Sequence, residues 1–165
     1  MQLDQILAGF NRHAVQYLLI GGVNFLLRHH GPMTVDIDLW IHDTKENRGR
    51  CEQALRDLGA EWGPTETDWG PVSRLNADWL ARQYVFCLNS SWGAIDIFRS
   101  VAGLGNWLDS AQRAISAVTP LGTPYRAISD HDMLNCQLAL DPAQQKNDRV
   151  RRLHEALKSP PNEPA

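Results

Sequence analysis

Cysteine is scarce in this sequence, and its spacing excludes a disulfide framework and a zinc site of the usual kind. Cys51, Cys87 and Cys136 are the only three in 165 residues, and no C-x-x-C pair is present. An odd number of widely spaced thiols is typical of a reducing compartment, which favours a cytoplasmic location. We interpret all three as small apolar residues that are buried in the core.

Long apolar runs and an excess of one charge are absent as well. No stretch approaches the roughly 20 apolar residues that cross a bilayer, and "MQLDQILAGFNRH" at the start does not have the basic-then-apolar pattern of a secretion signal. A membrane partner is therefore not expected. The formal net charge is only -3, so the overall charge does not require nucleic acid as a partner.

The chain does have enough apolar material for one core. It is 43% hydrophobic over 165 residues, and we predict a single domain over residues 1–158. The final stretch "SPPNEPA", residues 159–165, is predicted to be a disordered tail.

Hydrophobic periodicity predicts an alternation of helices and strands. The order begins with helix, strand, Gly-Gly turn, helix, strand and helix, in which "QYLLI" and "TVDIDLWI" are the strands. Residues 61–81 have no clear period and are predicted to be a loop region. "YVFCL" with "AIDIF", and then "RAISAVTPLGTPYRAIS", are typical of two β-hairpins. We predict an α/β (α+β) fold in which a small mixed β-sheet is flanked by helices.

The last third is predicted to be helical. Ser129 and Asp132 have the spacing of a capping box in front of "MLNCQLAL". Asp141 followed by Pro142 is typical of a helix start, which predicts a last helix over "AQQKNDRVRRLHEALK". We interpret the basic residues of this helix as a solvent-exposed face, in preference to a phosphate or RNA contact. These residues are Lys146, Arg149, Arg151 and Arg152.

Two aspartates interrupt a stretch that otherwise has the composition of a buried strand. In "TVDIDLWI", Asp36 and Asp38 project from one face, because side chains alternate along a strand, while Ile37 and Leu39 project from the other. Two carboxylates at this separation repel each other unless a cation or a proton compensates. Asp96 in "AIDIF" has similar apolar surroundings and would join the pair if the two strands were neighbours. Three convergent carboxylates are suited to two Mg²⁺ or Mn²⁺ ions.

Gly21 and Gly22 follow one predicted strand and precede a helix. Because they have no side chains, they would let backbone N–H groups approach the phosphates of a nucleotide at the positive end of that helix. Alone, such a pair fits any tight turn, and Asp36 and Asp38 alone fit a half-exposed strand with solvent-facing acids. The order of strand, Gly-Gly, helix, D-x-D strand and acid-bearing strand favours a metal and nucleotide site.

These stretches resemble a known family. "LLIGGVNFLLRHHGPMTVDIDLWI" followed by "AIDIF" is similar to the nucleotidyltransferase fold of the polymerase-beta superfamily, in the group of the small bacterial minimal nucleotidyltransferases and the abortive-infection nucleotidyltransferase toxins. The resemblance implies that Asp36, Asp38 and Asp96 are catalytic metal ligands. It also implies that Gly21 and Gly22 bind a nucleoside triphosphate, such as ATP, whose nucleoside monophosphate is transferred to an acceptor hydroxyl.

The resemblance extends more loosely to the helical end, where it implies a phosphate contact from Lys146. Many relatives carry a lysine in the penultimate helix, where this chain has Gln137, and a basic residue shortly after the H-G pair, where this chain has "PMT". Either that second contact is missing in this chain, or Arg28, His29 or His30 replaces it.

The acceptor stays open among a tRNA, a protein and a small molecule such as an antibiotic. The sequence is also compatible with a catalytically weak binding protein, with a toxin-antitoxin component that has an antitoxin partner, and with a homodimer that completes the acceptor site. We interpret the tryptophans in and after residues 61–81 as core residues in preference to a stacking surface for a base. They are Trp62, Trp69, Trp79 and Trp92.

Overall fold

The computed structural model describes residues 1–159, which are built around one mixed β-sheet. The sheet has 8 strands in the order β4-β3-β5-β6-β2-β1-β8-β7. The strands are β1 (Tyr17–Ile20), β2 (Asp36–Ile41), β3 (Glu61–Trp62), β4 (Gly70–Pro71), β5 (Val85–Ser90), β6 (Gly93–Phe98), β7 (Ile115–Val118) and β8 (Pro124–Ala127). Apart from Ser159, the predicted tail lies outside the described residues.

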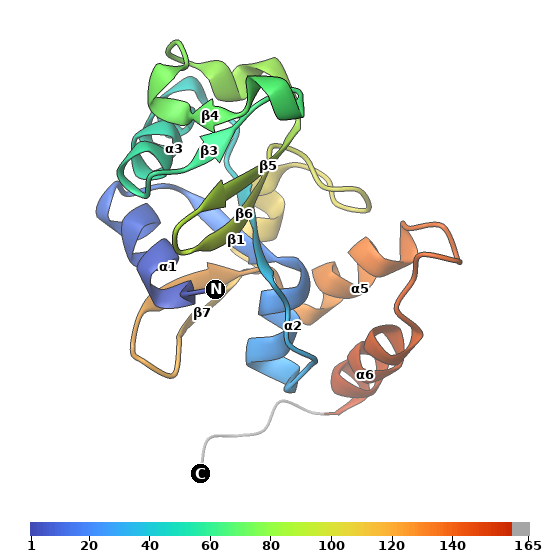
Figure 1. Ribbon diagram of the computed structural model, residues 1–165. Helices are drawn as coiled ribbons and strands as arrows, with labels where there is room; N and C mark the ends of the chain where they lie inside the picture. Colours follow the sequence, from blue (N-terminus) through green and yellow to red (C-terminus); the bar gives the residue numbers. More distant parts are fainter. Residues whose placement is uncertain (160–165) are drawn as a thin grey trace.

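Helices cover both faces of the sheet, with α1 and α3 on one side and α5 and α6 on the other (Figure 1). The helices are α1 (Leu3–Arg12), α2 (Gly21–His29), α3 (Lys45–Asp57), α4 (Trp107–Gln112), α5 (Asp130–Leu138) and α6 (Asn147–Lys158). The predicted mixed sheet flanked by helices is therefore confirmed. Within residues 1–159, none of the helices combines the length and the apolar content that a membrane span requires.

The central strand β2 serves both faces of the sheet. It pairs antiparallel with β1 and parallel with β6. Ile37 and Leu39 are fully buried in the core under α1 and α3. Asp36 and Asp38 project to the opposite face, where Trp40 continues the same row and enters the core under α5 and α6. Burial of Ile37 and Leu39 on one face of the sheet thus fixes the strand register, and this register directs Asp36 and Asp38 to the opposite face.

Several predicted elements are confirmed. Strands β5 and β6 form one antiparallel hairpin, and β7 and β8 form the second. The Ser129 hydroxyl accepts a hydrogen bond from the backbone N–H of Asp132, as the capping-box spacing predicted. Thr44 caps α3 in the same way by accepting from the backbone N–H of Asn47.

The predicted start of the last helix is wrong. Helix α6 begins at Asn147 instead of shortly after Pro142. The backbone carbonyl of Asp141 accepts hydrogen bonds from the N–H groups of Gln144 and Gln145, which close a separate turn. This turn reverses the chain, so that α6 packs back on α5.

The prediction of a loop over residues 61–81 holds only in part. This segment adds the short strands β3 and β4 beside β5, together with three 3-10 turns. The turns are η1 (Glu66–Asp68), η2 (Val72–Arg74) and η3 (Trp79–Arg82). Trp62 and Trp79 are buried and stack on each other with ring centroids 6.1 Å apart, which confirms their core interpretation. Trp92 is partly buried against the same core, whereas Trp69 is exposed.

The interpretation of the cysteines holds only in part. All three are free thiols; Cys51 is fully buried, Cys136 is half-buried and Cys87 is exposed. Cys87 lies on β5 between Phe86 and Leu88, which face the core, so strand alternation turns its side chain outward.

Candidate functional site

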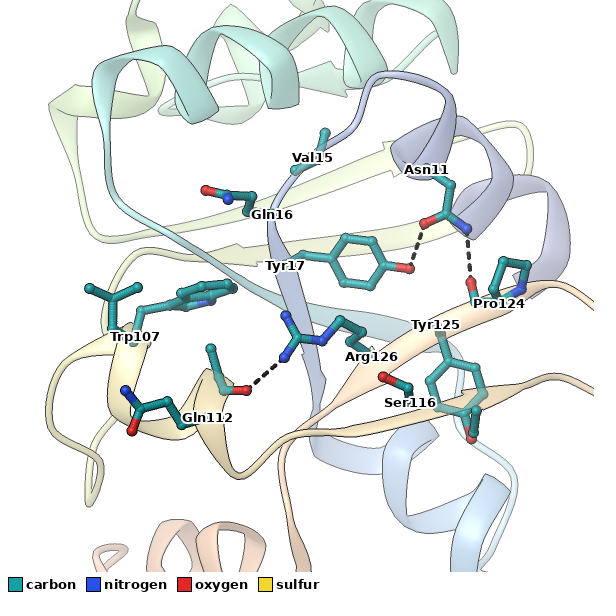
Figure 2. A pocket seen from close by; sticks show the side chains of 13 residues that line it. Asn11, Val15, Gln16, Tyr17, Trp107, Gln112, Ser116, Pro124, Tyr125 and Arg126 are labelled. Atoms are coloured by element: carbon teal, nitrogen blue, oxygen red, sulfur yellow. Dashed lines mark hydrogen bonds between the residues drawn. The ribbon is translucent and has the colours of Figure 1, made fainter.

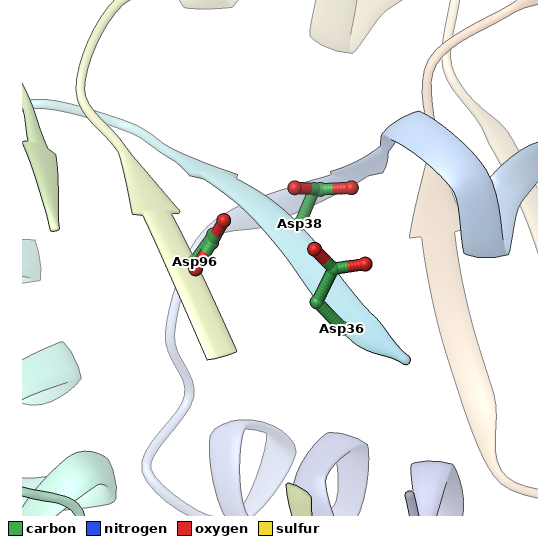
Figure 3. Close-up of side chains that lie close together, drawn as sticks. All are labelled: Asp36, Asp38 and Asp96. Atoms are coloured by element: carbon green, nitrogen blue, oxygen red, sulfur yellow. The ribbon is translucent and has the colours of Figure 1, made fainter. Parts of the chain in front are cut away.

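Three carboxylates meet on one face of the central strands (Figure 3). Asp36 and Asp38 lie on β2, and Asp96 lies directly opposite Asp38 in the parallel ladder between β2 and β6. One oxygen from each side chain lies within 4.8 Å of one oxygen from each of the other two. The structure thus brings together the three aspartates that the sequence singled out.

Gly21 is packed directly against Asp38. Its φ is +66°, and a Cβ at this position would lie 2.0 Å from Oδ2 of Asp38. The backbone N–H of Gly22 donates a hydrogen bond to the same carboxylate. Both glycines belong to the first turn of α2, whereas the sequence predicted a turn ahead of the helix. The pair therefore holds Asp38 against the positive end of α2, a contact that was not predicted.

Thr34 also belongs to the site, although its sequence pattern was not assigned a role there. Its hydroxyl donates a hydrogen bond of 2.7 Å to Oδ1 of Asp36. A Cβ on Gly22 would lie 3.1 Å from the same hydroxyl oxygen. Thr34 thus orients Asp36 and fills the space that a side chain at Gly22 would need. Its position two residues before Asp36 was the available signal, because i and i+2 share one face of an extended chain.

Burial and mutual repulsion raise the pKa of two of these carboxyls. Burial, followed by the charges of Asp36 and Asp96, raises the pKa of Asp38 to about 6, against the opposing hydrogen bond from Gly22. Burial also raises the pKa of Asp96, although a hydrogen bond from the Cys87 thiol acts in the other direction. Carboxyls in this state either bind protons or gain a cation.

Arg149 was misassigned to a solvent-exposed face. It is only 9% exposed, and the guanidinium carbon lies 4.9 Å from the centre of the Phe25 ring on α2. Burial lowers the pKa of Arg149, and the charge of Asp38 opposes this effect. Arg149 therefore places a buried positive charge beside the carboxylates. The available signal was its i, i+4 spacing from Leu153, a fully buried residue of the same helix.

The other basic residues of α6 lie on different faces. Lys146 is exposed at the N-cap, one turn before Arg149, and its backbone N–H donates to Oε1 of Gln137. Arg151 is exposed, as predicted, and forms ion pairs with two acids of its own helix. Arg152 is half-buried and donates a hydrogen bond to the backbone carbonyl of His29.

Arg28 and His29 are occupied by a structural contact. Nη2 of Arg28 lies 2.9 Å from Oδ1 of Asp130, and Nε2 of His29 lies 2.8 Å from the same oxygen. These contacts tie α2 to the start of α5. His30 is exposed and has a left-handed backbone at the end of α2. Within residues 1–159, these three residues make no direct hydrogen bond or ion pair with the carboxylates.

The carboxylate cluster fits a hard divalent cation. In the part of the chain that the structure describes, the cluster contains oxygen ligands only, which are the ligands that Mg²⁺ and Mn²⁺ prefer. Burial and the charges of Asp36 and Asp96 raise the pKa of Asp38, and the opposing charge of Arg149 does not cancel this rise, so a bound cation would stabilise the cluster. Such ions, when bound, supply neutralisation of phosphate charge and activation of a hydroxyl. The exposed side chains of Cys87 and Asn89 on β5 leave the sheet open to solvent beside Asp96.

Comparison with known proteins supports the fold. No family model and no curated protein sequence matches the chain. A solution structure of the antibiotic-resistance factor ANT(2'')-Ia is similar with a TM-score of 0.62 and 17% sequence identity, over 94% of this chain and 82% of that one. A crystal structure of ANT(2'')-Ia in complex with adenylyl-2''-tobramycin gives a TM-score of 0.61 and 16% identity, over 94% and 87% of the two chains. The chain therefore has a nucleotidyltransferase fold.

Proposed function

We propose that this protein is a nucleotidyltransferase that moves a nucleoside monophosphate from a nucleoside triphosphate to an acceptor hydroxyl. Asp36, Asp38 and Asp96 would hold two Mg²⁺ or Mn²⁺ ions. The observation that carries the proposal is the convergence of these three carboxylates within 4.8 Å of one another, on adjacent strands of a nucleotidyltransferase fold.

The surroundings of the carboxylates support binding of a triphosphate. The N-terminus of α2 lies against Asp38, and the dipole and backbone N–H groups at the start of a helix favour phosphate. The buried guanidinium of Arg149 adds a positive charge near the same carboxylate from a different element, α6. We assign phosphate binding to Gly21, Gly22 and Arg149, and we retain Lys146 as a further phosphate contact from the start of α6.

In the proposed reaction, the acceptor oxygen forms a bond to the α-phosphorus while the bond to the bridging oxygen breaks, and pyrophosphate leaves. We assign removal of the acceptor proton to a carboxylate oxygen of Asp96. This residue lies beside the open surface of β5, where an acceptor can approach one of its oxygens. Asp36, fixed by Thr34, and Asp38, fixed by Gly22, keep their oxygens aligned for the ions.

For the acceptor, we propose a small molecule with free hydroxyl groups. ANT(2'')-Ia, which aligns with 94% of this chain, has been captured with adenylyl-2''-tobramycin, an antibiotic that carries a nucleotidyl group. An aminoglycoside is therefore the first acceptor to test. The tRNA and protein acceptors, the homodimer, and the narrower resemblance to minimal nucleotidyltransferases and abortive-infection toxins with their antitoxins remain predictions from the sequence.

The test combines binding with turnover. Titration calorimetry with each of the four ribonucleoside triphosphates and Mg²⁺ identifies the donor, and pyrophosphate release in the presence of tobramycin then measures transfer. Asp38→Asn keeps the shape of the side chain and removes a charged ligand, so we expect loss of both metal-dependent binding and release. Asp141→Asn, at an exposed acid outside the cluster, should leave both unchanged. Full turnover by the Asp38→Asn variant would refute the proposal.

A further inference from the structure

A cavity lies at the other end of β1 from the carboxylates. Its volume is about 620 Å³, which is within the range of small-molecule sites. The register of β1 on β2 places Ile20 opposite Asp38, whereas Tyr17, which lines the cavity, is opposite Ile41. The cavity shares none of its lining residues with the carboxylate site or with the residues assigned to phosphate binding.

The cavity forms where two strands of the sheet separate. Among the described residues, Leu19 and Ala127 form the one recorded pair between β1 and β8. Before that pair the strands diverge, and Asn11 spans the gap (Figure 2). The Tyr17 hydroxyl donates to Oδ1 of Asn11 at 3.0 Å, and Nδ2 of Asn11 donates to the Pro124 carbonyl at 2.8 Å. Side-chain hydrogen bonds thus hold the opening in place.

Trp107 supplies a fixed aromatic wall. Its indole N–H donates to the Trp40 carbonyl at 3.0 Å, and its ring stacks on His42 with centroids 4.7 Å apart. Tyr17 adds a second aromatic ring to the lining. Because both rings are held by hydrogen bonds, an aromatic ligand would find its contacts already ordered.

Arg126 gives the cavity its charge. It is the one charged residue in the lining, and no carboxylate belongs to that lining. Its Nη2 donates to the Ala111 carbonyl at 2.6 Å, and no ion pair to Arg126 is found in residues 1–159. The side chain is exposed and projects into the space between Tyr17 and Gln112 (Figure 2). A guanidinium without an acidic partner, beside aromatic walls, complements an anion attached to a ring.

We propose that this cavity is a binding site for a small aromatic anion, such as an aromatic carboxylate or sulfonate. The ring contacts the wall formed by Trp107 and Tyr17, and the anionic group pairs with Arg126. This site is separate from the proposed nucleotidyl transfer, because its residues come from α1, β1, α4, β7, β8 and the connection between α1 and β1, and none of the three aspartates is among them.

The probe is 8-anilinonaphthalene-1-sulfonate, compared with N-phenyl-1-naphthylamine, which has similar rings but no sulfonate. Fluorescence titration of the full chain without nucleotide gives the Kd of each. Arg126→Gln should weaken sulfonate binding by about tenfold or more, the loss expected for one charge-assisted hydrogen bond, and should leave the neutral probe unchanged. Arg56→Gln, at an exposed arginine on α3 outside the cavity, is the matched control and should alter neither.

Ser116→Trp is the second variant. Ser116 is exposed on β7, lies opposite Arg126 in the hairpin and lines the cavity. A tryptophan there should fill the space and abolish binding of both probes, while circular dichroism shows the wild-type spectrum. Unchanged sulfonate binding by Arg126→Gln would overturn the proposal. So would a dimer in light scattering that Ser116→Trp converts to a monomer, because the surface would then be an interface between copies.

Discussion

At the scale of single residues, two glycines with nearly the same backbone have different surroundings. Gly21 has a φ of +66° and Gly59 a φ of +65°. A Cβ on Gly59 would meet nothing within 4 Å, whereas a Cβ on Gly21 would collide with Oδ2 of Asp38. Substitution of Gly59 therefore tests backbone strain alone, whereas substitution of Gly21 tests the same strain together with displacement of the Asp38 carboxylate.

Gly59→Ala should lower the free energy of unfolding by about 1–2 kcal/mol, the strain of a left-handed residue, and leave nucleotide binding intact. Gly21→Ala should lower it further and abolish Mg²⁺-dependent nucleotide binding, because the new methyl group moves Asp38. Urea denaturation and calorimetry measure the two effects. If both variants bound nucleotide equally well, the contact between Gly21 and Asp38 would have no functional role.

The raised pKa of Asp38 predicts how the stability of the metal-free protein depends on pH. This pKa is about 6 in the folded chain, compared with an ordinary value of 3.8. Between these values the folded state binds more protons than the unfolded state, so stability falls as the pH rises through that window. In a chelator, Asp38→Asn should therefore melt at a higher temperature than wild type above pH 6 and at a similar temperature near about pH 4. Asp141→Asn should show no such pH-dependent difference.

The three carboxylates could be predicted from the sequence, but the contacts that hold them in position could not. Strand alternation placed Asp36 and Asp38 on one face, and the hairpin signal around Asp96 supplied the third carboxylate. The contact between Gly21 and Asp38 depends on the antiparallel pairing of β1 with β2. That pairing joins strands that are separated in the chain by helix α2, and its register depends on both strands together, so the sequence of either strand alone does not predict it.

At the scale of elements, α6 brings Arg149 to the site from the end of the chain. The sequence placed a helix there, but its start was wrong because the Asp-Pro pair opens a separate turn. The i, i+4 spacing of Arg149 from Leu153 is typical of two residues on one buried helix face. Because arginine is charged, we nevertheless predicted that Arg149 is exposed to solvent. Phe25 and Asp38, which lie on other elements, supply the aromatic ring and the negative charge that accompany the burial of this arginine.

Arg149→Met should weaken binding of the magnesium nucleotide by about tenfold or more, because it removes a charge-assisted contact with phosphate while it keeps an unbranched apolar stem. Arg149→Lys should restore part of the affinity. Arg151→Met alters an exposed arginine of the same helix and is the matched control. Calorimetry gives the affinities, and thermal melting shows whether the helix stays docked. Equal affinity in the Met variant and in wild type would exclude Arg149 from phosphate binding.

At the scale of the whole molecule, ion pairs join the segment after β4 to the rest of the sheet. Arg48 on α3 contacts Asp78, just before η3, at 2.6 Å and Asp43, just after β2, at 2.7 Å. Arg99, just after β6, contacts the other oxygen of Asp43 at 2.8 Å. The hydrogen bond from Arg48 lowers the pKa of Asp78. The sequence predicted a loop in this segment because the segment has no hydrophobic periodicity of its own. It is held instead by ion pairs between side chains that are far apart in the chain.

Arg48→Met should lower the free energy of unfolding by about 1–3 kcal/mol, because its charge-assisted hydrogen bonds are largely shielded from water. Arg50→Met, which removes an exposed pair with Glu46 on the same helix, should lower it by no more than about 0.5 kcal/mol. A carboxyl whose pKa is lower in the folded state than in the unfolded state stabilises the fold at every pH above the unfolded-state pKa. This contribution is lost as the pH falls through the two pKa values. The difference between Arg48→Met and wild type, measured by urea denaturation, should therefore shrink as the pH is lowered below about 4. A difference that is independent of pH would show that Arg48 stabilises the segment by packing instead of by charge.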